Sequence, residues 1–267
     1  FLFFNQFKFH KQKILFHRIT MKKYQQYLKS LGRKVKYIES TETECDVRNL
    51  LENLCVNLNK IEIIDPDDDY IQKRISNFCK RNEIQLIVHE NPSFITKKSE
   101  LNEFFKKDKK KFFQTSFYKS QRKKFNILID QNGKPTGGDW TYDVMNREKY
   151  PKDKKPPKIE FAKENDKLFS ESLNFINTNY SQNPGLIDAQ FIYPTDHKNA
   201  KLWFLNFLKD RFNEFGPYED SIVKEESFLN HSLLSPLINS GLITPEFIVK
   251  ESINFYKKND IMINSCE

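Results

Sequence analysis

The sequence predicts an α/β fold with a Rossmann-like parallel sheet, followed by a linker and the start of an all-α domain. Three observations predict it. Short β-type runs alternate with helical stripes before about residue 125, a stretch rich in glycine and proline follows from about residue 130, and helical periodicity dominates afterwards.

The β-type runs cover residues 34–39, 61–65 and 84–90, and they alternate with helical segments as in βαβ units. Right-handed crossovers would stack these helices on a mostly parallel sheet. Residues 1–9 are apolar but lack a basic leader and a small-residue cleavage site, so they predict a further strand and not a signal peptide. The helical stripes are Ile14, His17, Met21, Tyr24 and Leu28, ended by Gly32; Val47, Leu50, Leu51, Leu54 and Leu58; and Ile71, Ile75, Phe78 and Cys79.

Two polar features in this half have competing interpretations. The turn Asp65-Pro66-Asp67 closes a strand at its carboxyl end, where open α/β sheets place ligands. We favour the other interpretation, in which these acids cap the next helix. His17 lies on the apolar stripe of its helix, which indicates a core histidine more than a ligand or a base.

The linker is rich in residues that break helices and strands, and helical periodicity follows it. Gly137 and Gly138 would let the backbone approach another surface closely, and Trp140 could anchor the loop. The remaining markers of the linker are Gly133, Pro135, Pro151, Pro156 and Pro157. The helical periodicity is clearest in Ala200, Trp203, Phe204, Phe207, Leu208, Phe212 and Phe215.

Composition predicts a globular protein. The chain has 267 residues, 38% hydrophobic and 14% aromatic, enough for one large or two modest cores. Its mean hydropathy is -0.71, and no apolar run approaches the roughly 20 residues that cross a bilayer, so we expect a soluble protein without a membrane partner. Cys45, Cys55, Cys79 and Cys266 form no CxxC pair, so neither a zinc site nor a disulfide framework is indicated, and we expect a cytoplasmic location.

The formal charge of +8 is concentrated in one stretch. Residues 97–124 hold eleven Lys or Arg against three acids, a net charge of +8, with six Phe or Tyr interleaved. Such a stretch would attract a polyanion by releasing its condensed counterions. A solvated, lysine-rich helix face is the alternative, and composition does not separate the two.

A helix start within residues 230–241 is a candidate phosphate site. Pro236 suits a first helical turn, because its missing N–H would be unpaired there, and Gly241 can end the helix in a left-handed conformation. Free N–H groups at such a start, together with the Ser232 and Ser235 hydroxyls, could bind a phosphate. From the residues alone we favour an ordinary Ser or Asn cap on a buried helix.

No other motif indicates catalysis. The five histidines show no HxxxH or HExxH grouping, and no GxSxG, Walker or GxGxxG pattern is present. We therefore assign no catalytic residue and no metal ligand.

Six motifs occur in order along the chain: Phe9-His10-Lys11-Gln12-Lys13, His17-Arg18-Ile19-Thr20-Met21, Gly133-Lys134-Pro135-Thr136-Gly137-Gly138-Asp139-Trp140-Thr141-Tyr142-Asp143, Asn146-Arg147, Phe215-Gly216-Pro217-Tyr218-Glu219-Asp220 and His231-Ser232-Leu233-Leu234-Ser235-Pro236. Together they resemble the photolyase and cryptochrome family, in its iron-sulfur bacterial cryptochrome and photolyase branch. The resemblance spans almost the whole chain, and its most specific parts are the linker motif and the run at 231–236.

The resemblance implies a photolyase N-terminal antenna-type domain at residues 1–125, an interdomain linker at 126–170 and the beginning of a helical FAD-binding domain at 171–267. In this family a Ser-x-Leu-Ser-type segment holds the FAD phosphates, which reverses our preference for an ordinary cap. Asn239-Ser240-Gly241 departs from the family's usual Asn-Leu-Gly. The cofactor contacts carried over are His231, Ser232, Leu233, Leu234 and Ser235, with Tyr218 as a weaker candidate.

The function implied is that of a light-dependent DNA photolyase, a carbon-carbon lyase that repairs UV pyrimidine dimers, of the six-four type. Repair would proceed by electron transfer from excited reduced FAD to a lesion extruded from the duplex. The expected partner is UV-damaged DNA, the expected state is a monomer, and an antenna chromophore is a second candidate cofactor. A cryptochrome-like blue-light receptor without repair activity and a non-flavin basic nucleic-acid-binding protein remain as alternatives.

We expect the chain to be a fragment. It has no starting Met, its first strand is expected to be missing, and residues 264–267 resemble the run leading into the family's Glu-Gly-Phe-Ile-Arg-Gln segment. The iron-sulfur cluster and the lesion-facing residues would then belong only to the parent protein, and this chain alone would be inactive.

Overall fold

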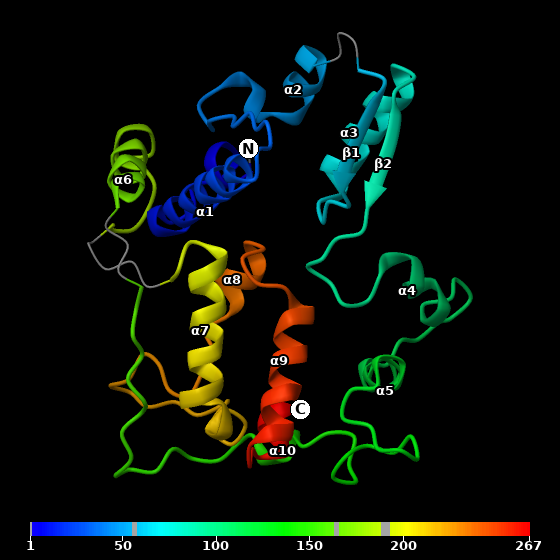
Figure 1. Ribbon diagram of the computed structural model, residues 1–267, viewed down its shortest axis with the longest axis vertical. Coiled ribbons are helices and arrows are strands. Elements are labelled where there is room, and N and C mark those ends of the chain that lie inside the picture. Colours follow the sequence, from blue (N-terminus) through cyan, green and yellow to red (C-terminus); the bar gives the residue numbers. More distant parts are fainter. Residues whose placement is uncertain (1, 55–57, 163–165, 188–192) are drawn as a thin grey trace. The chain divides into compact units, whose positions relative to one another are not determined.

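The computed structural model describes residues 2–54, 58–162, 166–187 and 193–267, and it divides into two compact units (Figure 1). The first unit joins Phe1–Asn91 to Phe161–Asp196, and the second joins Pro92–Glu160 to His197–Glu267. Each unit thus combines two stretches that are distant in sequence. These units are not the three consecutive segments expected from the resemblance, whose assignment as antenna domain, linker and flavin domain stays a prediction.

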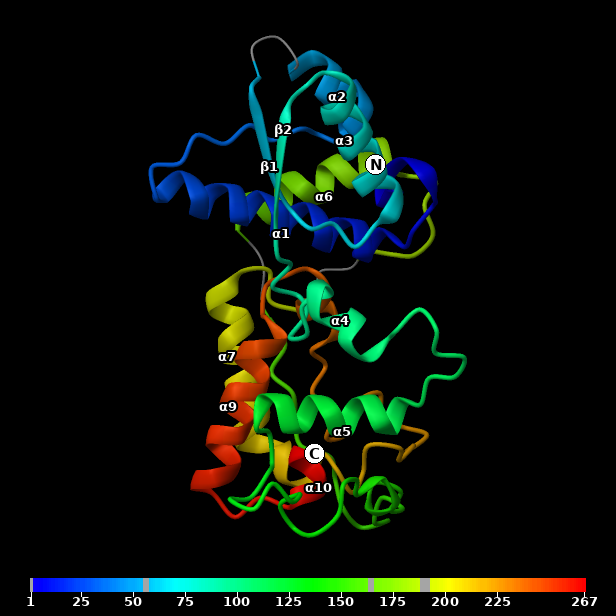
Figure 2. The same cartoon turned by 90° about the vertical axis from the view of Figure 1, so that its right-hand side faces the viewer.

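The first unit contains a β-α-β arrangement. β1 (Lys60–Ile64) and β2 (Gln85–His89) pair in parallel, with Lys60 opposite Gln85 and Ile64 opposite His89. α3 (Asp69–Arg81) connects the two strands (Figure 2). The strands predicted at 61–65 and 84–90, and the helix between them, are therefore confirmed as elements of a mixed α/β fold.

One face of this sheet covers a small core. Along β1, Ile61 and Ile63 are partly buried against that core, while Glu62 and Ile64 on the other face are exposed. α2 (Val47–Leu54) and α3 supply most of the other apolar side chains. The buried members are Leu51, Ile75, Phe78, Cys79 and Ile84.

The start of α3 corrects the interpretation of the acidic turn. The helix is capped by Asp68, whose carboxylate accepts a hydrogen bond from the Ile71 N–H at 2.8 Å. Asp67 instead accepts from the Asn91 amide at 2.9 Å. Capping by the acids of the 65–67 turn is therefore wrong, because the next acid along the chain, Asp68, caps the helix.

Two predicted strands are wrong. Residues 2–6 form a π-helical turn, η1 (Leu2–Gln6), in which Phe3 stacks on His17 with ring centroids 4.4 Å apart. Residues 34–39 contain no strand. The ring of Tyr37 lies under the Lys22 ammonium at 4.0 Å and Glu39 pairs with Arg18, so this segment contacts helix α1 and not a sheet.

α1 (Lys11–Ser30) confirms the first helical stripe in part. Ile14 is fully buried, but Met21 and Tyr24 are 45% and 47% exposed, so only the first half of the helix has a covered face. The helix ends at Ser30, just before Gly32, which has a positive φ of 74°. None of the described helices, α1 included, is both long and apolar enough to cross a membrane.

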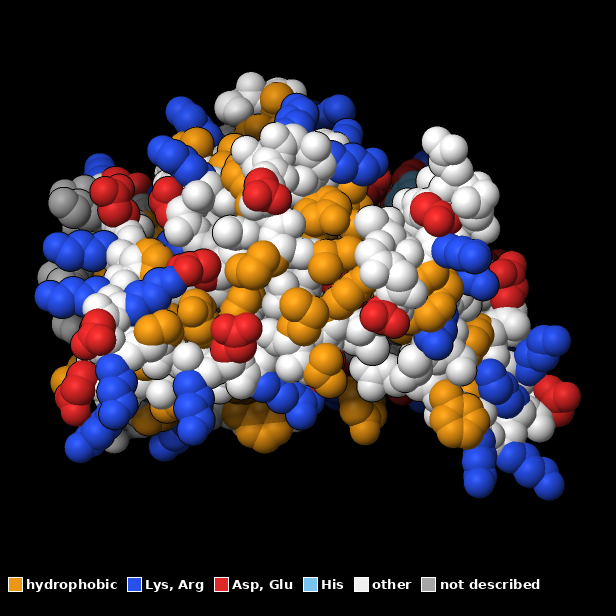
Figure 3. Space-filling view, turned by 90° about the horizontal axis from the view of Figure 1, so that it is seen from below, with side chains coloured by type: hydrophobic (Ala, Val, Ile, Leu, Met, Phe, Trp, Pro, Cys, Tyr) orange, Lys and Arg blue, Asp and Glu red, His pale blue; other side chains and the backbone are white. Residues whose placement is uncertain are grey.

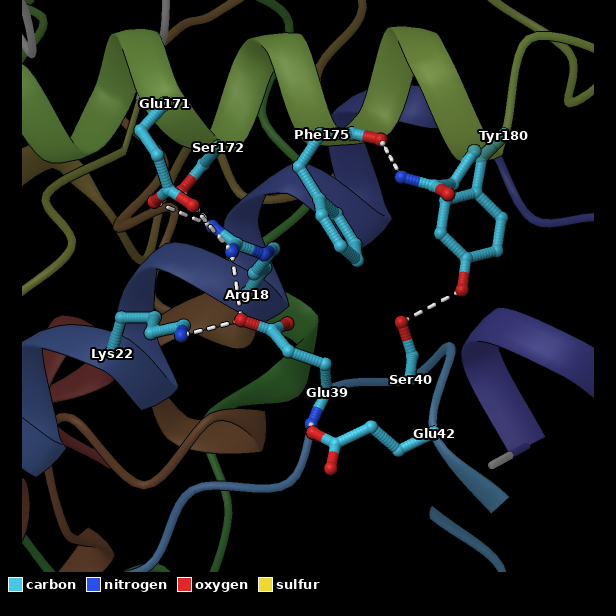
Figure 4. A network of polar contacts seen from close by, with 10 residues as sticks. Arg18, Lys22, Glu39, Ser40, Glu42, Glu171, Ser172, Phe175 and Tyr180 are labelled. Carbon is cyan, nitrogen blue, oxygen red and sulfur yellow. Dashed lines mark hydrogen bonds and ion pairs between the residues drawn. The ribbon is translucent and has the colours of Figure 1, made fainter. Parts of the chain in front are cut away.

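A buried arginine joins α1 to α6 (Lys167–Asn179), about 150 positions away in sequence (Figure 4). Arg18 is 1% exposed. Its guanidinium donates to both carboxylate oxygens of Glu171 at 2.8 and 3.0 Å, to the Ser172 hydroxyl at 2.6 Å and to Glu39 at 3.0 Å. The Phe175 ring lies 4.2 Å from the guanidinium carbon. Burial lowers the pKa of Arg18, but the two carboxylates outweigh burial and raise it.

In the described part of the second unit the regular elements are helices and one antiparallel bridge between Ile129 and Pro135, joined by long irregular segments. Its short 3₁₀ turns are η3 (Asp143–Met145) and η4 (Phe212–Glu214). α7 and α9 lie side by side in both ribbon views (Figures 1 and 2). The helices are α4 (Lys98–Phe104), α5 (Gln114–Phe125), α7 (His197–Asp210), α8 (Ser235–Asn239), α9 (Pro245–Lys258) and α10 (Ile263–Cys266).

The aromatic core of the second unit follows the predicted face of α7. Phe207 contacts the Phe212 and Phe215 rings, with centroids 5.7 and 5.6 Å apart, so the cluster continues past the helix end at Asp210. α9 adds Phe247 against Phe204 at 6.0 Å. The buried residues of α7 are those predicted: Ala200, Trp203, Phe204, Phe207 and Leu208.

The Gly-Gly-Asp-Trp motif makes the predicted close approach. Gly137 has a φ of 80°, and a Cβ there would lie 2.2 Å from the Tyr142 hydroxyl, so no larger residue fits. Arg122 of α5 is 3% exposed and fixes this segment to the helix. It donates to three backbone carbonyls, those of Ile127, Leu128 and Trp140.

His17 makes the stability of the first unit depend on pH. Burial, with a smaller contribution from Lys13, lowers the pKa of His17 from 6.5 to about 4. Above pH 6.5 both folded and unfolded chains hold a neutral imidazole. Between pH 6.5 and about 4 only the unfolded chain binds the proton, so stability falls by at most about 3 kcal/mol, and no further loss occurs below that window.

We expect His17→Phe, which keeps a ring against Phe3, to remove this part of the pH dependence. Urea unfolding at pH 7, 6 and 5 measures it, because most carboxylates stay ionised there. An equal loss of stability on acidification in both proteins would contradict the assignment.

Candidate functional site

Residues 231–235 lie between the aromatic core of the second unit and the start of α8. Two side chains from the α7 region hold the backbone of this segment by its carbonyl groups. The Arg211 Nε donates to the His231 carbonyl at 3.3 Å, and the Trp203 indole N–H donates to the Ser232 carbonyl at 3.2 Å. These bonds occupy two carbonyl groups of the segment and leave its N–H groups and hydroxyls able to bind another group.

The backbone of the segment changes hand at Leu233. This residue has a φ of 57°, and the next, Leu234, is right-handed with φ -86° and ψ -17°. A left-handed φ is uncommon for a bulky side chain and marks strain or a special geometry. Successive residues of opposite hand bring their N–H groups into a concavity that binds anions. The Leu234 side chain is 6% exposed and anchors the turn in the core.

The two serines are not helix caps. Leu234 is the N-cap of α8 and makes no side-chain capping bond, with Pro236 in the first turn as predicted. Ser232 is half-buried, Ser235 is exposed, and within the described part of the chain neither hydroxyl has a hydrogen-bond partner. The ordinary-cap interpretation is therefore wrong, and both hydroxyls can donate to a ligand. Gly241 has a φ of 73° and ends the short helix, as predicted.

A buried cation lies directly behind this segment. Arg211 is 5% exposed, and its guanidinium carbon is 5.5 Å from the Phe207 ring centroid. No carboxylate among the described residues pairs with it; its one hydrogen bond is the 3.3 Å bond to the His231 carbonyl. Burial lowers the pKa of Arg211, and the charge of Asp210 offsets this only in part. Buried charges in proteins are normally paired, so Arg211 is a candidate partner for an anionic ligand.

The remaining predicted residues lie beside the segment. The His231 ring accepts from the Leu229 N–H at 3.3 Å and contacts the Glu219 carbonyl at 3.1 Å, so it braces the backbone. Tyr218 packs on Tyr150 with ring centroids 4.7 Å apart. The Tyr150 hydroxyl in turn donates to Asn230 at 3.2 Å. The structure therefore brings Tyr218 near the start of the segment.

Sequence reasoning missed Arg211, Tyr150 and Lys154. Lys154 forms an ion pair with Glu214 and lies 5.1 Å from the Tyr218 ring centroid. A charged residue between the apolar positions Phe207 and Phe212 was a visible signal for Arg211, because long cations on a buried stripe need a partner. Nothing local in the sequence signals the other two.

The basic stretch 97–124 divides into structural and available cations. Arg122 is buried, Lys124 pairs with Glu100 at 2.9 Å, and Lys119 and Lys123 lie 5.7 and 5.3 Å from the Trp140 ring centroid. On the face in Figure 3, hydrophobic side chains lie among interspersed basic and acidic ones. The exposed lysines with neither an ion pair nor a ring contact within the described residues are Lys106, Lys107, Lys110 and Lys111.

The cysteines form no cluster in the described part of the chain. Cys45, Cys79 and Cys266 are free, and Cys55 lies outside the described residues. Within those residues no group of three or more His, Cys, Asp or Glu side chains is placed to hold a metal ion.

Comparison with known proteins gives one family and several relatives. Residues 2–192 match the model of a family described as deoxyribodipyrimidine photo-lyase-related protein. A (6-4) photolyase of Agrobacterium fabrum is 25% identical over 266 residues, which cover 97% of this chain and 51% of that protein. Uncharacterized protein R852 of Acanthamoeba polyphaga mimivirus is 36% identical over 147 residues, 54% of this chain and 74% of that protein. Uncharacterized protein R853 of the same virus is 44% identical over 43 residues, 16% of this chain and 33% of that protein.

Because Arg211 is buried without a carboxylate partner among the described residues, we expect its replacement to stabilise the chain. Arg211→Met keeps the length of the side chain and removes a charge whose burial no carboxylate offsets. We expect the free energy of unfolding of the ligand-free chain to rise by about 1 to 2 kcal/mol, whereas most substitutions of buried residues lower it. Urea unfolding in a buffer without phosphate or sulfate measures the change.

Arg18→Met is the matched control, because Arg18 is equally buried but paired with two carboxylates. It should lower the free energy of unfolding by about 1 to 3 kcal/mol, because Ser172 loses its buried partner while Glu39 and Glu171 remain partly hydrated. A loss of similar size in both variants would contradict the interpretation of Arg211.

Proposed function

Because the chain belongs to the deoxyribodipyrimidine photo-lyase-related protein family, we propose that it forms part of a light-dependent, FAD-containing DNA photolyase acting on UV pyrimidine dimers, six-four photoproducts in particular. The observation that carries the proposal is the anion-binding geometry at 231–235. It lies inside the alignment with the (6-4) photolyase, which covers 97% of this chain. The chain spans about half the length of that relative. The photolyase activity is therefore proposed for the protein that contains this chain.

The proposed fold extends the observed β-α-β arrangement. β1, α3 and β2 have the strand pairing and order of one repeat of a Rossmann-like sheet. We propose that this repeat belongs to an antenna-type α/β domain, and that α7, α8 and α9 begin a helical flavin domain. The aromatic contacts of α9 with α7 and η4 support a shared helical core.

The donors present fit the diphosphate of FAD. A phosphate group needs several N–H or O–H donors and a positive charge nearby. In the proposal the change of hand at Leu233 would supply converging N–H groups, Ser232 and Ser235 would supply hydroxyls that have no partner among the described residues, and Arg211 would supply the charge. Leu234 holds the turn in the core, while His231 and Tyr218 line its flank. Bound FAD would supply light absorption and an electron donor.

The residues of this chain have binding roles in the proposal. Ser232 and Ser235 donate to phosphate oxygens, and Arg211 neutralises part of their charge through a low-dielectric environment. Trp203 donates to the Ser232 carbonyl and so holds the backbone at this residue. None of these side chains is assigned a step in bond breaking, and no metal ligand is assigned in this chain.

The proposed macromolecular partner is UV-damaged DNA. Counterion release gives the exposed lysines of the 97–124 stretch an affinity for any polyanion. Phosphate contacts position a protein without reading bases, so the stretch would contribute affinity and not lesion recognition.

We expect replacement of Ser232 and Ser235 together by Ala to remove FAD from the protein that contains this chain. Each change deletes a charge-assisted hydrogen bond, worth about 1.5 to 3 kcal/mol. Flavin absorbance after purification reports retention, and the loss of a six-four lesion from an oligonucleotide under blue light with reduced flavin reports repair.

Ser240→Ala is the matched control, since its hydroxyl only donates to the Leu237 carbonyl in the same helix. It should leave flavin content and repair unchanged. Stoichiometric FAD in the double variant would contradict the phosphate site. If the unchanged protein held a full complement of flavin but did not repair the lesion in light, the function would instead be that of a light receptor.

We also expect Lys109→Gln, Lys110→Gln and Lys111→Gln together to flatten the dependence of duplex affinity on salt. Each phosphate contact contributes about 0.9 to the slope of log affinity against log salt, so the triple variant should flatten it by up to about 2.7. The Lys109 ammonium lies 3.8 Å from the Phe104 ring centroid, so we expect a change nearer about 1.8, from the other two lysines. Fluorescence anisotropy over a salt series measures the slope, and an unchanged slope would leave the run as a solvated surface.

A further inference from the structure

The segment between α4 and α5, residues 105–113, presents aromatic rings and lysines together. Phe112 is 52% exposed and Phe113 is 61% exposed. The ribbon runs outward between the two helices as a loop (Figure 2). Two adjacent exposed rings are unusual on a protein surface, because each leaves a large apolar area in water.

This loop is fixed at its base by an aromatic cluster. Phe105 lies 5.0 Å from Phe117 and 5.1 Å from Phe112, and Phe104 lies 5.1 Å from Phe117, measured between ring centroids. The Lys109 ammonium lies over the Phe104 ring. The loop is therefore attached to α5 while its outer rings stay exposed in the folded unit.

A phenylalanine occupies the N-cap position of α5, where it stabilises the helix less than a polar residue would. Phe113 is the N-cap of α5 and makes no side-chain capping bond. Ser, Thr, Asp or Asn at this position would satisfy an N–H group of the first turn, and Phe leaves it unsatisfied. Phe113 also makes no ring contact with any described aromatic residue. A ring that makes neither a cap nor a ring contact among the described residues, and is 61% exposed, is available for a ligand.

The charge of the loop selects the class of ligand. Residues 106–111 contain five lysines and one aspartate, a net charge of +4, directly before the two rings. Lysines neutralise phosphates, and exposed rings stack on unpaired bases irrespective of sequence. We propose that Phe112 and Phe113 form a stacking site for the bases of a single-stranded or locally unpaired nucleic acid, whose backbone the lysines contact. The choice of nucleic acid over an anionic membrane rests on the proposed function.

Replacement of both rings by Leu tests the proposal, since leucine keeps an apolar side chain but has no face on which a base can stack. The probe is a fluorescein-labelled single-stranded thymidine 20-mer, titrated with the full chain and followed by anisotropy over a salt series. We expect the affinity of Phe112→Leu with Phe113→Leu to fall about tenfold at every salt concentration, with the salt slope unchanged. Phe113→Leu alone, which disturbs no ring contact, should show part of the same loss.

Phe94→Leu is the matched control, because Phe94 is 58% exposed in the same unit and lies outside the lysine run. It should bind like the unchanged chain. Equal affinity of the double variant and the unchanged chain would overturn the stacking site. If the lysine-to-glutamine changes at 110 and 111 still flattened the salt slope in that case, the proposed binding of DNA by the lysines would stand. Absence of binding by the unchanged chain would overturn both. Tight binding to phosphatidylserine vesicles that both leucine variants retain would assign the loop to a membrane and overturn the proposal.

Discussion

The burial of positive charge is the constraint on which both units depend. Three arginines are buried among the described residues, Arg18, Arg122 and Arg211, and each is stabilised differently. Arg18 has two carboxylates, and joins helices about 150 positions apart. Arg122 has three carbonyls, and fixes the glycine-rich segment to α5. Within the described residues Arg211 bonds to one carbonyl and pairs with no carboxylate, and it lies behind the segment whose Ser232 and Ser235 hydroxyls have no partner there. Comparing the three arginines singles out Arg211 and so supports the candidate site at residues 231–235 more strongly than the geometry of that segment does alone.

Sequence reasoning succeeded where burial repeats at short spacing. The strands at 61–65 and 84–90, the helix between them and the buried face of α7 all follow from apolar positions two, three or four residues apart. It failed at 34–39, where the β-type pattern is overridden by contacts of Glu39 and Tyr37 with α1. It also failed at Met21 and Tyr24, because α1 is covered along only half of its length. Such long-range contacts leave no local trace.

The candidate site divides in the same way. Pro236 and Gly241 predict the short helix α8 from the residues alone, and the family resemblance indicates which serines to examine. The left-handed φ at Leu233 has no sequence signal, since leucine is an unfavourable residue there. The burial of Arg211 depends on contacts with the Phe207 ring and the His231 carbonyl, which form only in the folded unit.

The central claim is that residues 231–235, with Arg211 behind them, hold the diphosphate of FAD. A crystal structure of the flavin-loaded protein that contains this chain tests it most directly. The account predicts phosphate oxygens within hydrogen-bonding distance of the Ser232 and Ser235 hydroxyls and the Leu234 N–H, with Arg211 still buried and without a carboxylate partner. A flavin whose phosphates contact other residues, with both serine hydroxyls facing water, would contradict it.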